Sequence, residues 1–129
     1  CWRAFNSNYK TQYVGTSTVY HVGGATLKNS NPKKTYLNFR NSLMTLVKNT
    51  DNNVFSKAIT RMLLDGVAGV MFLMQLKPAH FIAILKAHGS FYLNLSNVLK
   101  ERKTLKKLPN YYQTSSIVWS YYVKKKQTF

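Results

Sequence analysis

The segment Pro32-Lys-Lys-Thr-Tyr-Leu-Asn-Phe-Arg-Asn-Ser-Leu43 predicts a helix, and the rest of the fold is built outward from it. Proline stands at its start, where the first turn of a helix needs no amide donor. Apolar side chains then recur every three to four residues, which predicts one apolar face along the helix. They are Tyr36, Phe39, Leu43 and Leu46. The polar run 49–53 predicts the end of this helix and the cap of the next one.

Two more helices are expected downstream. The first covers about residues 54–76 and carries Asp65 in its apolar second half. Pro78 opens the second, and one long apolar stripe follows it. The stripe consists of Phe81, Ile84, Leu85, His88, Phe91, Tyr92, Leu95, Val98 and Leu99. With an aromatic and basic segment at 114–126, these patterns predict three to four amphipathic helices in a basic, membrane-associating region, residues 32–129.

The chain before this helical region has a different pattern. Trp2 and Phe5 lie three residues apart, as on the last turns of a helix. The runs Tyr9–Val14 and Ser17–Val22 are rich in Tyr, Val and Thr and predict two strands separated by Gly15 and Thr16. The expected fold is therefore mixed and mainly α. Residues 1–31 would be the remnant of an α/β domain, and helices would follow.

Charge restricts the class of partner. The 19 Lys and Arg residues outnumber the three acidic residues and give a formal net charge of +16. Such a balance indicates a polyanionic partner, either a nucleic acid or an anionic membrane surface. None of the expected helices is apolar enough to span a bilayer, whereas amphipathic helices with nearby Trp, Tyr and Lys are typical of helices lying in the membrane interface.

Two alternatives to the membrane interpretation stay open. The apolar stripes would equally suit the core of a helical bundle whose lysines face water. Basic residues interleaved with tyrosine could also bind phosphates and stack on bases, as a non-catalytic nucleic-acid-binding module would. No recognised nucleic-acid-binding motif is present, so the membrane interpretation is favoured.

The few acidic residues give no sign of an acid–base pair. Asp51, Asp65 and Glu101 are not paired at a spacing suited to acid–base catalysis. His80 and His88 lie on or beside an apolar helix face and have no metal-ligand spacing, which favours structural roles. This chain by itself is therefore not expected to be an active enzyme.

The stretch Thr18-Val-Tyr-His-Val-Gly-Gly24 contains the best candidate for a functional group. Its histidine ends a β-branched run, and the two glycines after it allow a sharp turn or a close approach to a ligand. A histidine hydrogen-bonded within its own loop remains the alternative.

Four segments together resemble a known family. Cys1-Trp2-Arg3, Tyr9-Lys10, Val19–Gly24 and Asn31–Asn41 are similar to the C-terminal part of bacterial family 2 glycosyltransferases. The resemblance implies the end of a nucleotide-sugar-binding α/β domain, cut just after the acidic motif that supplies the catalytic base. It also implies an inverting, metal-dependent sugar transfer at the cytoplasmic face of the bacterial inner membrane, with peripheral attachment.

Site residues follow from the same resemblance. His21 would complete the coordination of a divalent Mg or Mn ion that bridges the donor diphosphate. Lys34, Arg40 and Asn41 would contact substrate or phosphate, although solvent exposure alone would also explain them. Supporting roles fall to Trp2, Arg3, Gly23 and Gly24. The implied partners are a nucleotide-sugar donor, a glycan or lipid-linked acceptor and an anionic membrane surface.

Overall fold

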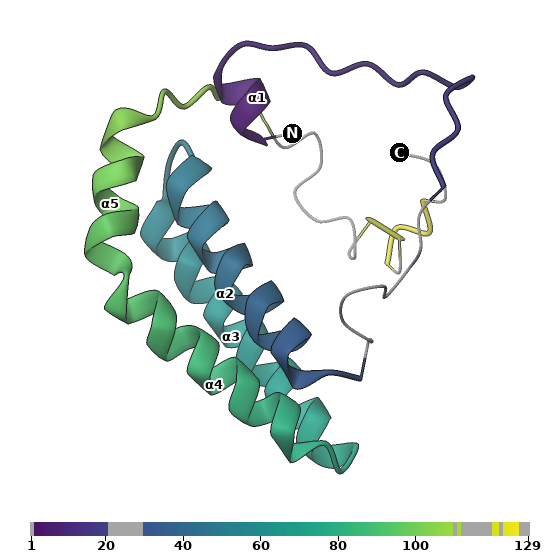
Figure 1. Ribbon diagram of the computed structural model, residues 1–129, viewed down its shortest axis with the longest axis vertical. Helices are drawn as coiled ribbons and strands as arrows, with labels where there is room; N and C mark the ends of the chain where they lie inside the picture. Colours follow the sequence, from purple (N-terminus) through teal and green to yellow (C-terminus); the bar gives the residue numbers. More distant parts are fainter. Residues whose placement is uncertain (1, 21–29, 110, 112–119, 122, 127–129) are drawn as a thin grey trace.

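The computed structural model describes residues 2–20, 30–109, 111, 120–121 and 123–126. In this part of the chain the elements are helices, joined by turns and extended segments (Figure 1). In chain order they are α1 (Trp2–Asn6), α2 (Pro32–Asn49), α3 (Val54–Met74), α4 (Pro78–Leu93) and α5 (Leu95–Thr104).

The prediction of two strands at the end of an α/β domain is wrong. Residues 9–20 form an extended segment with a turn, in which the Ser17 amide donates to the Val14 carbonyl at 3.1 Å. None of the residues in the described ranges belongs to a strand. Tyr20, 94% exposed, illustrates the reason: Tyr and Val favour strands only where a pleated surface covers them, and here no sheet does. Residues 21 and 22 of the second predicted strand lie outside the described part.

Helix α2 begins where the sequence predicts. The Asn31 side chain accepts a hydrogen bond from the Lys33 amide at 2.9 Å, and Pro32 occupies the first turn. The predicted apolar face is only partly the buried one, since Leu43 and Val47 are buried whereas Tyr36, Phe39 and Leu46 are half-buried. The core assembles around this face. It consists of Leu43, Val47, Ala58, Phe91 and Val98.

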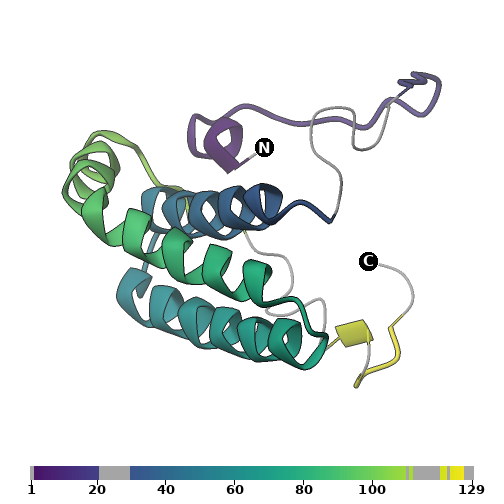
Figure 2. The same cartoon turned by 60° about the horizontal axis from the view of Figure 1, so that its bottom comes forward.

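Helix α4 packs against both α2 and α3 (Figure 2). Its inner residues Ala83, Ile84 and Ala87 are buried, and their small or branched side chains allow close packing. At the contact with α3, a methyl group at Gly69 would lie 3.0 Å from the Phe81 ring. Gly69 therefore permits the close approach of α3 and α4.

The long helix expected after Pro78 is divided in two. Helix α4 ends at Leu93, and α5 begins at Leu95 and runs in a different direction (Figure 1). Between them, the Asn94 side chain donates to the Ser90 carbonyl at 2.8 Å. Asparagine competes in this way with regular helical hydrogen bonds. The apolar stripe nevertheless continues, because Phe91 and Val98 on either side of the break are both buried.

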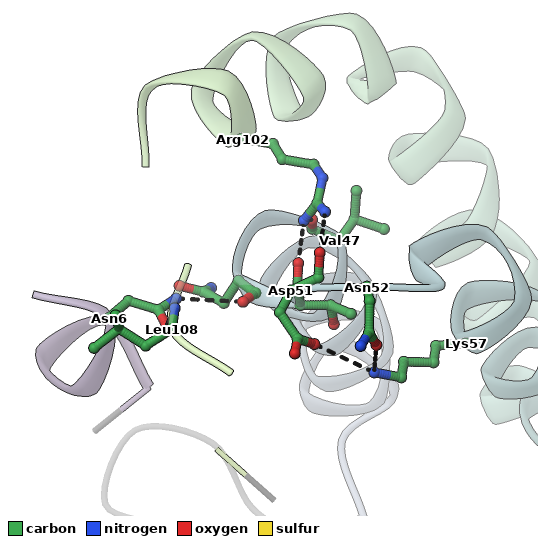
Figure 3. Close-up of polar contacts among 9 residues, drawn as sticks. Asn6, Val47, Asp51, Asn52, Lys57, Arg102 and Leu108 are labelled. Atoms are coloured by element: carbon green, nitrogen blue, oxygen red, sulfur yellow. Dashed lines mark hydrogen bonds and ion pairs between the residues drawn. The ribbon is translucent and has the colours of Figure 1, made fainter. Parts of the chain in front are cut away.

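A polar junction holds α5 against the end of α2 (Figure 3). Nη1 of Arg102 donates to the carbonyls of Val47 and Thr50 at 2.8 and 2.5 Å. Carbonyls at the C-terminal end of a helix lack intrahelical partners and carry partial negative charge, so a guanidinium group is well suited to them. On the other side, Asn6 Nδ2 donates to the Asn49 carbonyl at 3.2 Å and connects α1 to the same helix end.

Candidate functional site

Three residues of the predicted site fall outside the part of the chain that the structure describes. These are the proposed metal ligand His21 and the glycines Gly23 and Gly24. Within the described ranges, no three His, Cys, Asp or Glu side chains lie close enough together to hold a metal ion. The metal prediction for His21 therefore stays a prediction.

The structure brings Trp2, Arg3 and Asn41 together. They line a hollow of about 430 Å³ between α1 and α2, and Lys48 lies at its rim. An adjoining hollow of about 460 Å³ shares Trp2 and Asn41 and reaches Arg61 on α3. The Trp2 ring also stacks on Tyr111, with ring centres 4.7 Å apart. Both hollows have mixed linings, in which amide, hydroxyl and cationic side chains lie beside the Trp2 ring and the apolar side chains of Met44 and Leu46.

Arg40 points along its own helix. Its Nε donates to Asn41 Oδ1 at 3.1 Å, and its Nη1 donates to the Tyr36 hydroxyl at 3.2 Å. Hydrogen bonds from Ser90 and then Arg40 lower the pKa of the Tyr36 hydroxyl. Lys34 lies seven residues before Asn41, which is about 10 Å along the helix axis. The structure therefore groups Arg40 with Asn41 and leaves Lys34 apart from both.

Two of the histidines join helices. Nδ1 of His80 lies 2.7 Å from Thr35 Oγ1 in a buried hydrogen bond between α4 and α2, and its ring stacks on Phe72 of α3. Nε2 of His88 lies 3.1 Å from Asp65 Oδ2 and so connects α4 to α3. For His80, these contacts agree with the structural role predicted for it.

Asp65 is the most deeply buried charged group in the described ranges. Its side chain is inaccessible to water and lies between His88 and Arg61, whose Nη2 is 3.1 Å from Oδ1. That pair has ion-pair distance without the alignment of a hydrogen bond. A buried carboxylate without such partners would be very unfavourable, because the protein interior solvates charge poorly.

Sequence reasoning missed the contact between Asp65 and His88. A signal for it was present: an aspartate in an otherwise apolar helical segment needs a cationic or donor partner. Arg61, four residues earlier, accounted for one side of the carboxylate. The second partner comes from another helix, and which of the 23 following residues would face Asp65 depends on how α3 and α4 pack.

A groove of about 360 Å³ lies above this charged cluster, between α3 and α4. Ile59 and Leu63 from α3 and Phe81 and Leu85 from α4 contribute its apolar walls, and His88 contributes a polar group. Its size and largely apolar lining are typical of small-molecule sites.

The groove opens beside a broad apolar surface, which we call the outer face of α3. It consists of Phe55, Ile59, Leu63, Val67, Met71 and Met74, all exposed, with Leu63 at 68%. On the α4 side of the groove, the exposed side chains of Leu85 and Tyr92 line it and continue this surface. Contiguous apolar surfaces of this kind mark interaction sites, whereas single exposed apolar side chains do not.

No helix among the described residues has both the length and the apolarity required to span a bilayer. Comparisons with protein-family models, with curated proteins and with solved structures find no match to this chain.

Proposed function

We propose that this chain is the C-terminal portion of a membrane-associated glycosyltransferase, and that its helical region lies on an anionic membrane surface. One observation carries the membrane part: the outer face of α3 is apolar and exposed along the length of a 21-residue helix. Water is an unfavourable environment for such a surface, and each Leu or Val side chain that becomes fully buried contributes about 1.5–3 kcal/mol.

Charge favours a membrane over a protein as the partner of this face. The chain carries a formal net charge of +16, and the exposed Lys77 lies between α3 and α4, three residues after Met74 of the outer face of α3. Each lysine near an anionic leaflet adds about 1 kcal/mol of attraction. A second copy of the same chain would instead bring two strongly positive molecules together.

The enzymatic part of the proposal depends on the sequence resemblance alone. The intact enzyme would transfer a sugar from a nucleotide-sugar donor to a cell-surface glycan or lipid-linked acceptor. A divalent metal would be held partly by His21, and the catalytic base would come from residues that precede this chain. The 129 residues by themselves are expected to turn over no nucleotide sugar.

Flotation with liposomes tests the membrane part. We expect the chain to float with vesicles of phosphatidylglycerol and phosphatidylcholine, and much less with phosphatidylcholine alone. The triple variant Leu63→Ser, Val67→Ser, Met71→Ser should lose flotation, because it removes apolar area from the outer face of α3.

A matched control is Tyr9→Ser, Tyr13→Ser, Tyr20→Ser, which removes three side chains that are also exposed but lie on the extended segment. Equal losses in both triple variants would contradict a specific role for α3. Salt-sensitive binding to DNA without flotation would contradict the membrane assignment and favour a nucleic-acid-binding module.

The enzymatic part is tested in the intact protein. His21→Ala should greatly lower metal-dependent sugar transfer, and Tyr20→Phe, one residue earlier, should have little effect. Unchanged activity and unchanged metal dependence in the His21→Ala enzyme would contradict the metal role.

A further inference from the structure

The imidazole ring of His88 lines the groove between α3 and α4. Its Nε2 lies 3.1 Å from the Asp65 carboxylate, which can only accept, so Nε2 is the nitrogen that donates. In the neutral imidazole the lone pair is then on Nδ1. No hydrogen bond reaches Nδ1 from the residues that the structure describes, and the His88 side chain is 19% exposed.

The charge of the cluster limits which headgroup could lie beside it. Arg61 and Asp65 form an ion pair at 3.1 Å, so their formal charges cancel. A carboxylate or phosphate would find no donor on Nδ1 of the neutral imidazole and would lie near the Asp65 carboxylate. A neutral hydroxyl group can donate to Nδ1 without these costs.

The remainder of the groove suits a hydrocarbon chain. Ile59, Leu63 and Leu85 line it, and Gly66 leaves its mouth open, because a methyl group there would meet no atom within 4 Å. The groove is also continuous with the outer face of α3. A chain dissolved in a bilayer under that face could enter the groove without crossing water.

We propose that the α3–α4 groove binds the hydrocarbon chain of a single-chain amphiphile whose hydroxyl group donates a hydrogen bond to His88 Nδ1. The ligand class is thus a long-chain alcohol or a hydroxyl-bearing single-chain lipid. This inference deepens the proposed function and rests on it, because the membrane supplies the ligand.

Titration with 1-decanol tests the headgroup contact in the full chain with ¹⁵N-labelled histidine. We expect a saturable shift of the His88 ring nitrogens, assigned with His88→Gln. The methyl ether 1-methoxydecane has the same chain but cannot donate, so it should bind about three- to tenfold more weakly, as the loss of one hydrogen bond implies. Equal affinities for the alcohol and the ether would overturn the proposal.

Filling the groove tests its location. Gly66→Leu places a side chain in the groove mouth, and leucine favours a helix over glycine, so the fold is retained. Decanol binding should weaken at least tenfold. Gly89→Leu is the matched control, because Gly89 is also an open helical glycine, on α4, and does not line the groove. Decanol binding by Gly66→Leu at the wild-type affinity would overturn the proposal.

Flotation of the same proteins separates this inference from the proposed function. Gly66→Leu should still float with anionic vesicles, since leucine adds apolar area to the surface. Flotation of the wild-type chain without decanol binding would overturn the groove proposal alone. Decanol binding without flotation would remove the membrane proposal and leave the groove. If the wild-type chain formed a dimer and Gly66→Leu dissociated it, the groove would bind a second copy of the chain. That result would overturn the proposal of an amphiphile.

Discussion

Helices α3 and α4 are both rich in apolar residues, but they bury them to different extents. Helix α4 contacts α2 on one side and α3 on the other, and its residues His80, Ala83, Ile84, Ala87 and Phe91 are buried. Helix α3 is longer, and only Ala58, Asp65 and Gly69 are buried in it. An apolar sequence therefore indicates how much surface a helix could bury. Its neighbours decide how much is buried within this chain.

The largest expected effect is the loss of a buried side chain from α4. Ile84→Ala should lower the free energy of unfolding by about 2–5 kcal/mol, because Ile84 is almost fully enclosed. Leu63→Ala, on the outer face of α3, should change it by about 0.5 kcal/mol or less. Urea unfolding measures both. A large loss in the Leu63→Ala variant would mean that the outer face of α3 is covered in solution.

Asp65 connects the two helices and should give the next largest effect. Asp65→Ala leaves His88 and Arg61 without their shared acceptor, and we expect a loss of about 1–3 kcal/mol in urea unfolding. Asp65→Asn keeps an acceptor for His88 and should lose less. A neutral result for Asp65→Ala would show that the cluster does not stabilise the contact between α3 and α4.

The two glycines of α3 compare its inner and outer sides directly. Gly66→Ala meets open space and should stabilise the chain by about 1 kcal/mol through helix propensity. Gly69→Ala brings a methyl group to 3.0 Å from the Phe81 ring, so displacement of the ring offsets that gain. We expect Gly69→Ala to be about 1 kcal/mol less stable than Gly66→Ala in thermal unfolding. Equal stability would indicate that α3 and α4 pack less closely.

The smallest effect concerns Asp51, a partly exposed counterpart of the fully buried Asp65. The Asn52 amide, and then Lys57 at 3.5 Å, lower the pKa of the Asp51 carboxyl below its usual range (Figure 3). The folded state thus prefers the ionised form, and its contribution to stability is present above about pH 4 and is lost as the pH falls through the lowered pKa.

Urea midpoints between pH 2 and 6 check this dependence. Asp51→Asn should slightly reduce the fall of the urea midpoint at acid pH. Asn52→Ala keeps the backbone amide donor and should leave this fall unchanged. If the urea midpoint of Asp51→Asn fell at acid pH as much as that of the wild type, groups other than Asp51 would be responsible for the pH dependence of stability.

Much of the helical region could be predicted from local sequence. Pro32, Val54 and Pro78 begin helices as expected, since proline and apolar periodicity act within a few residues. The cap predicted for the helix at Val54 is wrong, because Asn53 makes no side-chain hydrogen bond to it. The break at Asn94 was not predicted, because the apolar stripe continues across it, whereas the break lies in the backbone of Asn94 and in its side-chain hydrogen bond to Ser90. The strands were predicted from residue preference alone, and the described residues of the segment lack the neighbouring strand that this preference requires.

The candidate site was less predictable than the helices. The resemblance named Trp2, Arg3 and Asn41, which the structure brings to one hollow, but it also named His21, which lies outside the described residues. The groove and the contact between Asp65 and His88 were not predicted, because they depend on the rotation of α3 against α4.

The sequence alone determined the positive charge, the helical periodicity after Pro32 and the helix starts, since these depend on composition and on interactions within one or two turns. Tertiary structure decided which apolar faces are buried. It also decided that α3 keeps its outer face exposed and that His88 lies beside Asp65, 23 residues away in the chain. These features depend on packing between helices, and side-chain volumes and crossing geometry set that packing only when all the helices are present together.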